Sequence, residues 1–201
     1  MNLLALDTSN RFVSVALFSE NGSILSKQKE MERGQGENLI PIIKELLKEA
    51  QKDISDITAV AVAVGPGSFA GLRIGIATAK AFGLALKIPV LGVTNLEALA
   101  CNTKGAITVL LDSKRGDYFV QHFMNGQPLD SPHIESVEVL KKSLPFNAVG
   151  DISDISCKLI GCNFKKINTH TAISVAQIAH TRIDHPLEPE PLYLRDADVT
   201  V

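Results

Sequence analysis

Apolar runs of strand length alternate with stretches of helical spacing along the first half of the chain. The expected order is β-β-β-α-β-α-β-α, with strands at 2–7, 12–19, 23–30, 58–64 and 89–93 and helices at 37–51, 71–87 and 95–100. Asn21 and Gly22 predict a hairpin turn between the second and third strands. This pattern predicts an α/β unit.

The second half repeats the same order of elements. Strands are expected at 107–112, 118–123, 128–134, 147–150 and 164–168, and helices at 136–144, 152–160 and 174–183. The junctions also correspond, because Asp7 lies 14 residues before the first Asn-Gly pair and Asp112 lies 13 before the second. The shared order and matched junctions predict an internal duplication.

Duplicated βββαβαβ halves, with an Asp-hydroxyl turn between the first two strands, resemble the actin-like ATPase (ASKHA) fold. We therefore predict an α/β protein with two actin-like lobes. The first lobe is expected at 1–103 and the second, smaller lobe at 104–185. The proline-rich residues 186–201 are expected to form a tail that packs back on the first lobe.

The composition predicts a globular chain with a sizeable core, since 45% of its 201 residues are hydrophobic. A formal net charge of −2 and the absence of a dense Lys/Arg block argue against strong electrostatic binding of nucleic acid by this chain alone. Any RNA contact is expected to be shared with a partner. Three cysteines without a C-x-x-C pair predict core thiols rather than disulfides or a cysteine zinc site.

No targeting or membrane segment is expected. The N-terminal stretch MNLLALDTSNRF lacks a basic region and reaches Asp7 too early for a signal peptide. The longest apolar stretch, residues 74–86, is interrupted by Lys80 and is shorter than the ~20 residues that a membrane span needs. We therefore expect a cytoplasmic protein.

The stretch GPGSFAGLRIG, which begins at Gly65, has the form of a phosphate-binding turn: a strand, then glycines, then a helix. It is not a P-loop, because Leu72 and Arg73 stand where Lys and Ser/Thr are required. The spacing G-x-G-x-x-[GA] is met, but Pro66 removes one N–H and the acidic residue expected about 20 positions on is missing. The turn is predicted to position a helix.

Ser68 raises the possibility of a hydrolase. The nucleophile elbow G-x-S-x-G is not matched, because Gly67 directly precedes Ser68 and Ala70 stands two after it. Ser68 is predicted to be the N-cap of the following helix.

Asp7, Thr8 and Asp112 are the candidates for a residual nucleotide site, since they follow the first strand of each half. Neither DTSN nor DSKR carries the glycine that lets phosphate approach the backbone. The alternative is that Asp7, Thr8 and Ser9 form a turn capped by side chains.

No metal ligand set is predicted from spacing. The nearest pair of histidines, His180 and His185, is five residues apart, which places the two on different faces of a helix. His122, His133 and His170 are interpreted as strand-edge or surface residues.

The predicted helix over 71–87 is more apolar than a surface helix needs to be. Its charged residues, Arg73, Lys80 and Lys87, recur every seven positions and form one narrow stripe. Either the helix is buried in its own lobe, or its second face binds another protein, which we favour. The predicted interface draws on this helix and on the stripe over 37–51: Leu39, Ile43, Leu46, Gly71, Leu72, Arg73, Gly75, Ala77, Thr78 and Ala81.

LALDTSN, GPGSFAGLRIG, LLDSKRGDYF and PLYLR occur in this order, and together they resemble the TsaB (YeaZ) family. The family pattern reads PGSFTGLRIG, so Ala70 stands where the family has Thr. Gln35 stands where a His is expected.

The resemblance implies a noncatalytic scaffold and activator in the synthesis of N6-threonylcarbamoyladenosine (t6A) in tRNA. Such a chain pairs with the transferase paralogue TsaD, assists recruitment of the ATPase TsaE, and forms a homodimer when alone. It meets tRNA only within the complex, and ATP and metal belong to its partners, so we expect no catalytic residue, cofactor or metal on this chain. The alternative is an autonomous actin-like ATPase or small-molecule kinase that uses Asp7 and Asp112.

Overall fold

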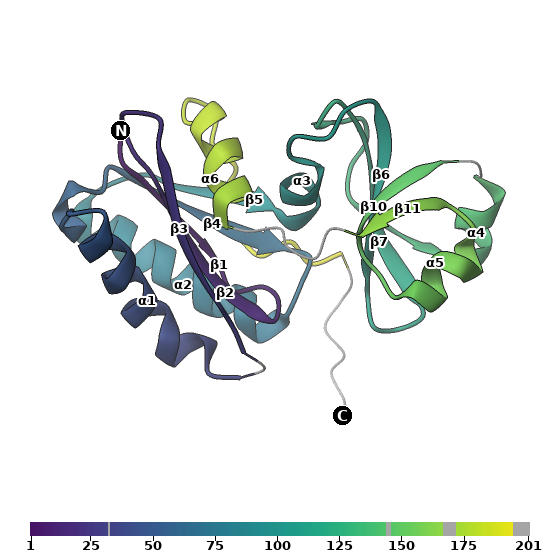
Figure 1. The fold of residues 1–201 in the computed structure, drawn as a ribbon, viewed down its shortest axis with the longest axis horizontal. Helices are drawn as coiled ribbons and strands as arrows, with labels where there is room; N and C mark the ends of the chain where they lie inside the picture. Colours follow the sequence, from purple (N-terminus) through teal and green to yellow (C-terminus); the bar gives the residue numbers. More distant parts are fainter. Residues whose placement is uncertain (32, 144–145, 167–171, 195–201) are drawn as a thin grey trace. The chain divides into compact units, whose positions relative to one another are not determined.

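Two β-sheets with the same strand order organise the chain (Figure 1). The computed structural model describes residues 1–31, 33–143, 146–166 and 172–194, and the contacts divide them into two units. The first unit contains residues 1–98 and 172–191. The second contains residues 99–166 and 192–194. Each unit is an α/β layer structure, as predicted.

The first sheet has the order β3-β2-β1-β4-β5. Its strands are β1 (Leu3–Asp7), β2 (Phe12–Phe18), β3 (Ile24–Glu30), β4 (Ala59–Gly65) and β5 (Val90–Thr94). β1 pairs antiparallel with β2 and parallel with β4, and β4 pairs parallel with β5. Every residue of β1 and β4 is buried, which explains why both read as continuous apolar runs.

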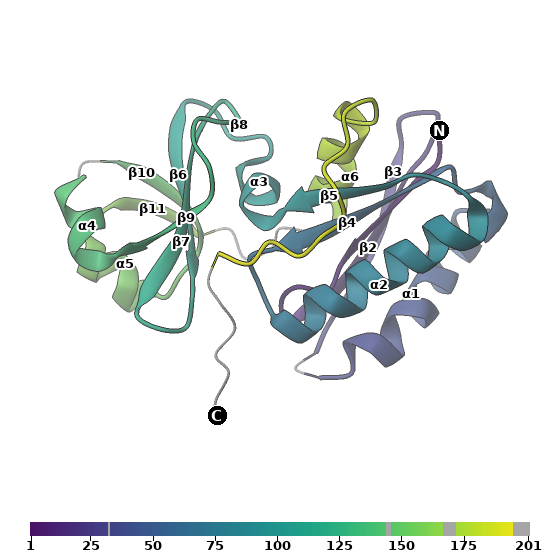
Figure 2. The same ribbon diagram turned by 180° about the vertical axis from the view of Figure 1, so that it is seen from behind.

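Helices cover both faces of this sheet (Figures 1 and 2). α1 (Gln35–Glu49) and α2 (Phe69–Leu86) pack with Leu4 and Leu6 of β1 in one hydrophobic core. Leu3 of the same strand points the other way, into a second core with α6 (Ala172–Thr181). A 3-10 turn (Ile54–Asp56) precedes β4, and α3 (Asn95–Ala100) follows β5.

The second sheet has the order β11-β10-β6-β7-β8, with β9 also paired to β7. The strands are β6 (Ala106–Asp112), β7 (Asp117–Met124), β8 (Gln127–Pro128), β9 (His133–Ser136), β10 (Asn147–Asp151) and β11 (Asn163–Lys166). Its helices are α4 (Val137–Lys142) and α5 (Asp154–Ile160). With β8 and β9 together taken as the third strand, this is the order of the first sheet, which confirms the duplicated actin-like arrangement.

The division between the units differs from the predicted boundaries of 1–103 and 104–185. It falls after Ala98, within α3, and α6 joins the first unit rather than the second. α6 joins the first unit because its small apolar side chains are buried in the core of the first sheet. These residues are Ala172, Val175, Ala176 and Ala179. Element order cannot show which sheet a terminal helix covers.

Part of the predicted tail 186–201 also lies on the first unit. The Gly92 N–H donates to the Leu187 carbonyl at 2.7 Å, and Lys80 forms an ion pair with Glu190. Residues 195–201 lie outside the described residues.

Glycines place α2 unusually close to the turn that follows β1. A Cβ on Gly71 would stand 2.0 Å from the Thr8 carbonyl oxygen, and a Cβ on Gly75 would stand 2.7 Å from Thr8 Oγ1. Real Cβ atoms essentially never come within 3.0 Å of such atoms. The helix can therefore occupy this position only because both residues lack a side chain.

We predict that Gly71→Ala destabilises the protein by about 2–3 kcal/mol, although Gly to Ala ordinarily stabilises a helix interior by about 1 kcal/mol. The added methyl forces α2 away from Thr8. The free energy of unfolding, measured by urea denaturation, tests this expectation.

Gly36→Ala is the matched control, because a Cβ on Gly36 makes only ordinary contacts with Ile74 at 3.7 Å. It should leave stability unchanged or raise it slightly. Equal stability of Gly71→Ala and the unsubstituted chain would contradict this close packing.

Candidate functional site

The carboxylate of the first candidate residue, Asp7, accepts hydrogen bonds from the turn that follows it. Its side chain is fully buried, and Oδ1 accepts hydrogen bonds from the Ser9 N–H at 2.9 Å and from Ser9 Oγ at 2.6 Å. Oδ2 accepts a third from Asn10 Nδ2 at 3.1 Å. The turn capped by side chains, which the sequence offered as the alternative to a nucleotide site, is thus present.

Hydrogen bonds also fix the glycine-rich turn to residues 8 and 9. Thr8 Oγ1 donates to the Gly71 carbonyl at 2.6 Å, and the Ser68 N–H donates to the Ser9 carbonyl at 2.7 Å. Asn95 Nδ2 bridges the Ser9 hydroxyl and the Pro66 carbonyl, at 2.8 Å each. A phosphate-binding turn presents its backbone N–H groups to a ligand, whereas here the Ser68 N–H is directed at the chain's own carbonyl.

Ser68 is the N-cap of α2, as predicted. Its hydroxyl accepts a hydrogen bond from the Gly71 N–H at 3.3 Å, and α2 begins at Phe69. The hydroxyl therefore satisfies one of the free N–H groups at the start of the helix, which is a structural use.

Asp112, the equivalent acid in the second unit, also closes a turn. Its Oδ1 accepts the Lys114 N–H at 2.7 Å, and Oδ2 lies 3.1 Å from Lys114 Nζ. A cofactor role for Asp7, Thr8 and Asp112 stays a prediction.

The opposite side of α2 presents an apolar surface. Leu72, Ile76, Ala79 and Gly83 face the core of the unit and are buried. The outer α2 face, which we define as Phe69, Arg73, Ala77, Lys80, Ala81 and Leu84, is exposed, and its Lys80 forms an ion pair with Glu190. Leu84 is the extreme case, with 84% of its surface accessible.

Arg73 is held in place on the outer α2 face by its neighbour. Its guanidinium lies over the Phe69 ring, 3.7 Å from the centroid. This cation–π contact keeps one charge and one aromatic ring together at the N-terminal end of the face.

The interface predicted from sequence stays a prediction, and the structure shows how its ten residues lie within the first unit. Six of them are buried there: Leu39, Ile43, Leu46, Gly71, Leu72 and Gly75. The α1 stripe is apolar because it covers its own sheet. Arg73, Ala77 and Ala81 remain exposed, and Thr78 is half-buried.

Sequence analysis missed Phe69 and Leu84. The charged residues Arg73 and Lys80 indicate which side of the helix faces outward. Phe69 and Leu84 could have been predicted from them, because helical spacing places both on the same side.

α2 is long and apolar enough to cross a membrane by length and composition alone. One such helix is weak grounds for a membrane span, and here Leu72 and Ile76 belong to the core around β4. Phe69, Ala77, Ala81 and Leu84 of the same helix are exposed.

Comparison with known proteins links the chain to tRNA modification. The family model described as TsaD, tRNA N6-adenosine threonylcarbamoyltransferase, matches residues 24–197. The tRNA threonylcarbamoyladenosine biosynthesis protein TsaB of Bacillus subtilis is 33% identical over 131 residues, which are 63% of this chain but only 57% of that protein. An uncharacterised protein of Mycobacterium tuberculosis is 28% identical over 198 residues, which are 98% of this chain and 92% of that one.

Two solved structures of Pseudomonas aeruginosa proteins have the same fold. One is of a protein with similarity to peptidase YeaZ, with a TM-score of 0.79 at 25% identity, and the other is of YeaZ, with a TM-score of 0.76 at 24% identity. Each comparison covers 96% of this chain and 99% of the other. The chain therefore belongs to the family that the TsaD model describes and, within it, to the TsaB (YeaZ) branch.

Proposed function

We propose that this chain is a noncatalytic subunit of the machinery that makes t6A in tRNA, and that it activates a TsaD-type transferase paralogue by pairing with it. The observation that carries the proposal is the exposed outer α2 face. A long helix that presents small and apolar residues to solvent is typical of a surface that another helix covers.

The residues of this face suit close helix pairing. Ala77 and Ala81 have short side chains, so a second helix axis can approach to about 8–10 Å. Leu84 and Phe69 supply apolar area at the two ends, and Arg73 is of a type enriched at interface hot spots. The same face would pair two copies of this chain when no paralogue is present.

The proposal places the chemistry on partner subunits. The buried Asp7 and the hydrogen-bonded glycine-rich turn support a chain that holds no ATP of its own, and the ATP and the metal used in the reaction belong to its partners. Recruitment of a TsaE-type ATPase and contact with tRNA only within the complex rest on the family resemblance. The relatives that modify tRNA indicate a soluble protein, and we place this one in the cytoplasm.

The second candidate function is an autonomous actin-like ATPase or small-molecule kinase. The observation in its favour is that Asp7 and Asp112 end the equivalent strands β1 and β6 of the duplicated fold. The observation against it is that both carboxylates accept hydrogen bonds within their own turns.

We predict that the purified chain hydrolyses ATP no faster than buffer and does not modify tRNA when alone. Asp7→Ala should instead lower the free energy of unfolding by about 2–4 kcal/mol, because three donors, two of them buried, lose their acceptor. Asp112→Ala is the matched control and should cost less, since its side chain is 25% exposed. ATP turnover that is abolished in a folded Asp7→Ala variant would favour the kinase or ATPase.

We predict that Ala77→Arg and Ala81→Arg each fold normally but weaken binding to the transferase paralogue roughly 100-fold, or about 3 kcal/mol. Both positions are exposed in this chain, and a partner helix would bury the added charge without a counterion. Thermal unfolding and isothermal titration with the purified paralogue measure the two effects.

Ala106→Arg, at an exposed position on β6 in the second unit, is the control for the same change away from the helix. It should bind as the unsubstituted chain does. The pairing proposal fails if both α2 variants fold and bind unchanged, and the assignment of the outer α2 face fails if both unfold.

A further inference from the structure

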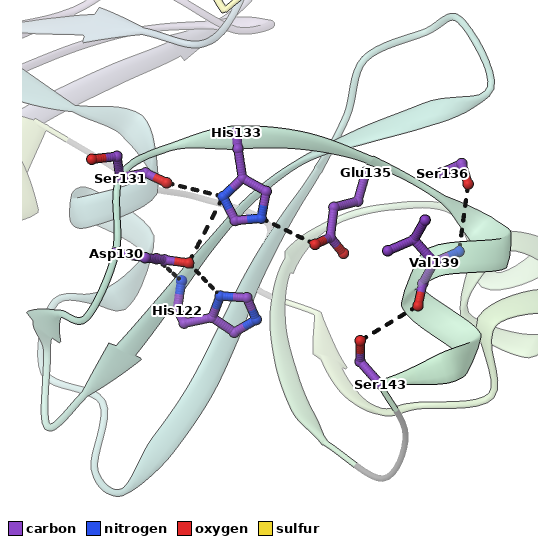
Figure 3. Close-up of polar contacts among 8 residues, drawn as sticks. All are labelled: His122, Asp130, Ser131, His133, Glu135, Ser136, Val139 and Ser143. Carbon is purple, nitrogen blue, oxygen red and sulfur yellow. Dashed lines mark hydrogen bonds and ion pairs between the residues drawn. The ribbon is translucent and has the colours of Figure 1, made fainter.

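The second unit brings two histidines and an aspartate together on neighbouring strands (Figure 3). His122 lies on β7, His133 begins β9, and Asp130 lies in the segment that joins β8 to β9. One candidate ligand atom from each residue lies within 4.8 Å of the other two. Among the described residues, this is the group with the composition and spacing of a metal site.

Asp130 lies at the centre of the cluster. Its Oδ2 is 2.6 Å from His122 Nδ1 and 3.8 Å from His133 Nδ1. Its other oxygen, Oδ1, accepts the His122 backbone N–H at 2.8 Å, which fixes the carboxylate plane. The two imidazole rings stack at 5.8 Å between centroids. The backbone contact and the ring stacking therefore hold the three side chains close together.

Asp130 gives the cluster a carboxylate oxygen beside two imidazole nitrogens, and these are ligand types that divalent transition metals take.

We propose that His122, Asp130 and His133 form a binding site for a divalent transition metal of the Zn²⁺ type. Tetrahedral Zn²⁺ with bonds of about 2.0–2.1 Å needs donor atoms about 3.3 Å apart. The two distances to Asp130 Oδ2 lie on either side of this value, so small side-chain rotations suffice. Two imidazoles and one carboxylate leave at least one coordination position for water or another ligand.

His133 has the second contact that metal-binding histidines usually have. Its Nε2 lies 3.2 Å from Glu135 Oε1, so this ring nitrogen can donate to a carboxylate while Nδ1 faces the metal. Without metal, Nδ1 instead lies 2.9 Å from the Ser131 carbonyl. Metal binding exchanges this contact for a bond to the ion, and the Nδ1 proton is released to solvent.

The arrangement H-x7-D-x2-H differs from the ligand spacings considered in the sequence analysis, which predicted no metal. Those spacings place ligands on one helix or in cysteine pairs. Here the pairing of β7 with β9, with Val120 opposite His133, brings residues 11 positions apart in the sequence to one place.

The test titrates Zn²⁺ into the untagged, chelator-treated full chain by isothermal calorimetry, with Co²⁺ absorption as a second readout. We expect one ion per chain at micromolar affinity or tighter, and a higher melting temperature with Zn²⁺. His122→Asn and His133→Asn should abolish saturable binding, and Glu135→Gln should weaken it about 10-fold through loss of the second contact.

His185→Asn is the matched control, because His185 is an exposed histidine outside the cluster. It should bind Zn²⁺ like the unsubstituted chain. Melting curves without metal identify any variant that fails to fold. If a histidine variant fails to fold, Asp130→Asn removes a different ligand and should likewise abolish Zn²⁺ binding. The proposal is overturned if the unsubstituted chain binds no Zn²⁺ saturably, or if the cluster variants bind it as tightly as His185→Asn does.

Discussion

The contact between Gly71 and the Thr8 carbonyl is the constraint on which the rest of the first unit depends. It fixes the distance of α2 from β1, and the bond from Thr8 Oγ1 to the Gly71 carbonyl fixes its direction. With the helix in this position, the Ser68 N–H of the glycine-rich turn donates to the Ser9 carbonyl. The turn thus holds the start of α2 against residues 8 and 9.

This position gives α2 two different sides. The inner side supplies Leu72 and Ile76 to the core and is closed to partners. The outer side leaves Ala77, Ala81 and Leu84 exposed to solvent, beside Arg73 and Lys80. On the proposed function, this one packing arrangement both holds the glycine-rich turn against the chain's own backbone and leaves the outer α2 face for pairing with a transferase paralogue.

Local signals made most of the fold predictable. Strand-length apolar runs, the two Asn-Gly turns and Ser68 as N-cap all depend on near neighbours in the sequence. The features that local signals do not reveal depend on distant residues. Leu46 is equally apolar whether it faces its own sheet or a partner. The place of α6 in the repeat does not indicate which sheet it covers, and His122 and His133 meet only through strand pairing.

Hydrogen–deuterium exchange tests the central claim most directly. Amide exchange in Phe69–Leu86 would be compared for the chain alone, as a function of its concentration, and after mixing with the transferase paralogue. The account predicts that α2 gains protection on pairing, because a covered helix opens less often, while the exposed α5 in the second unit is unchanged. Protection that appears elsewhere while α2 exchanges as before would contradict it.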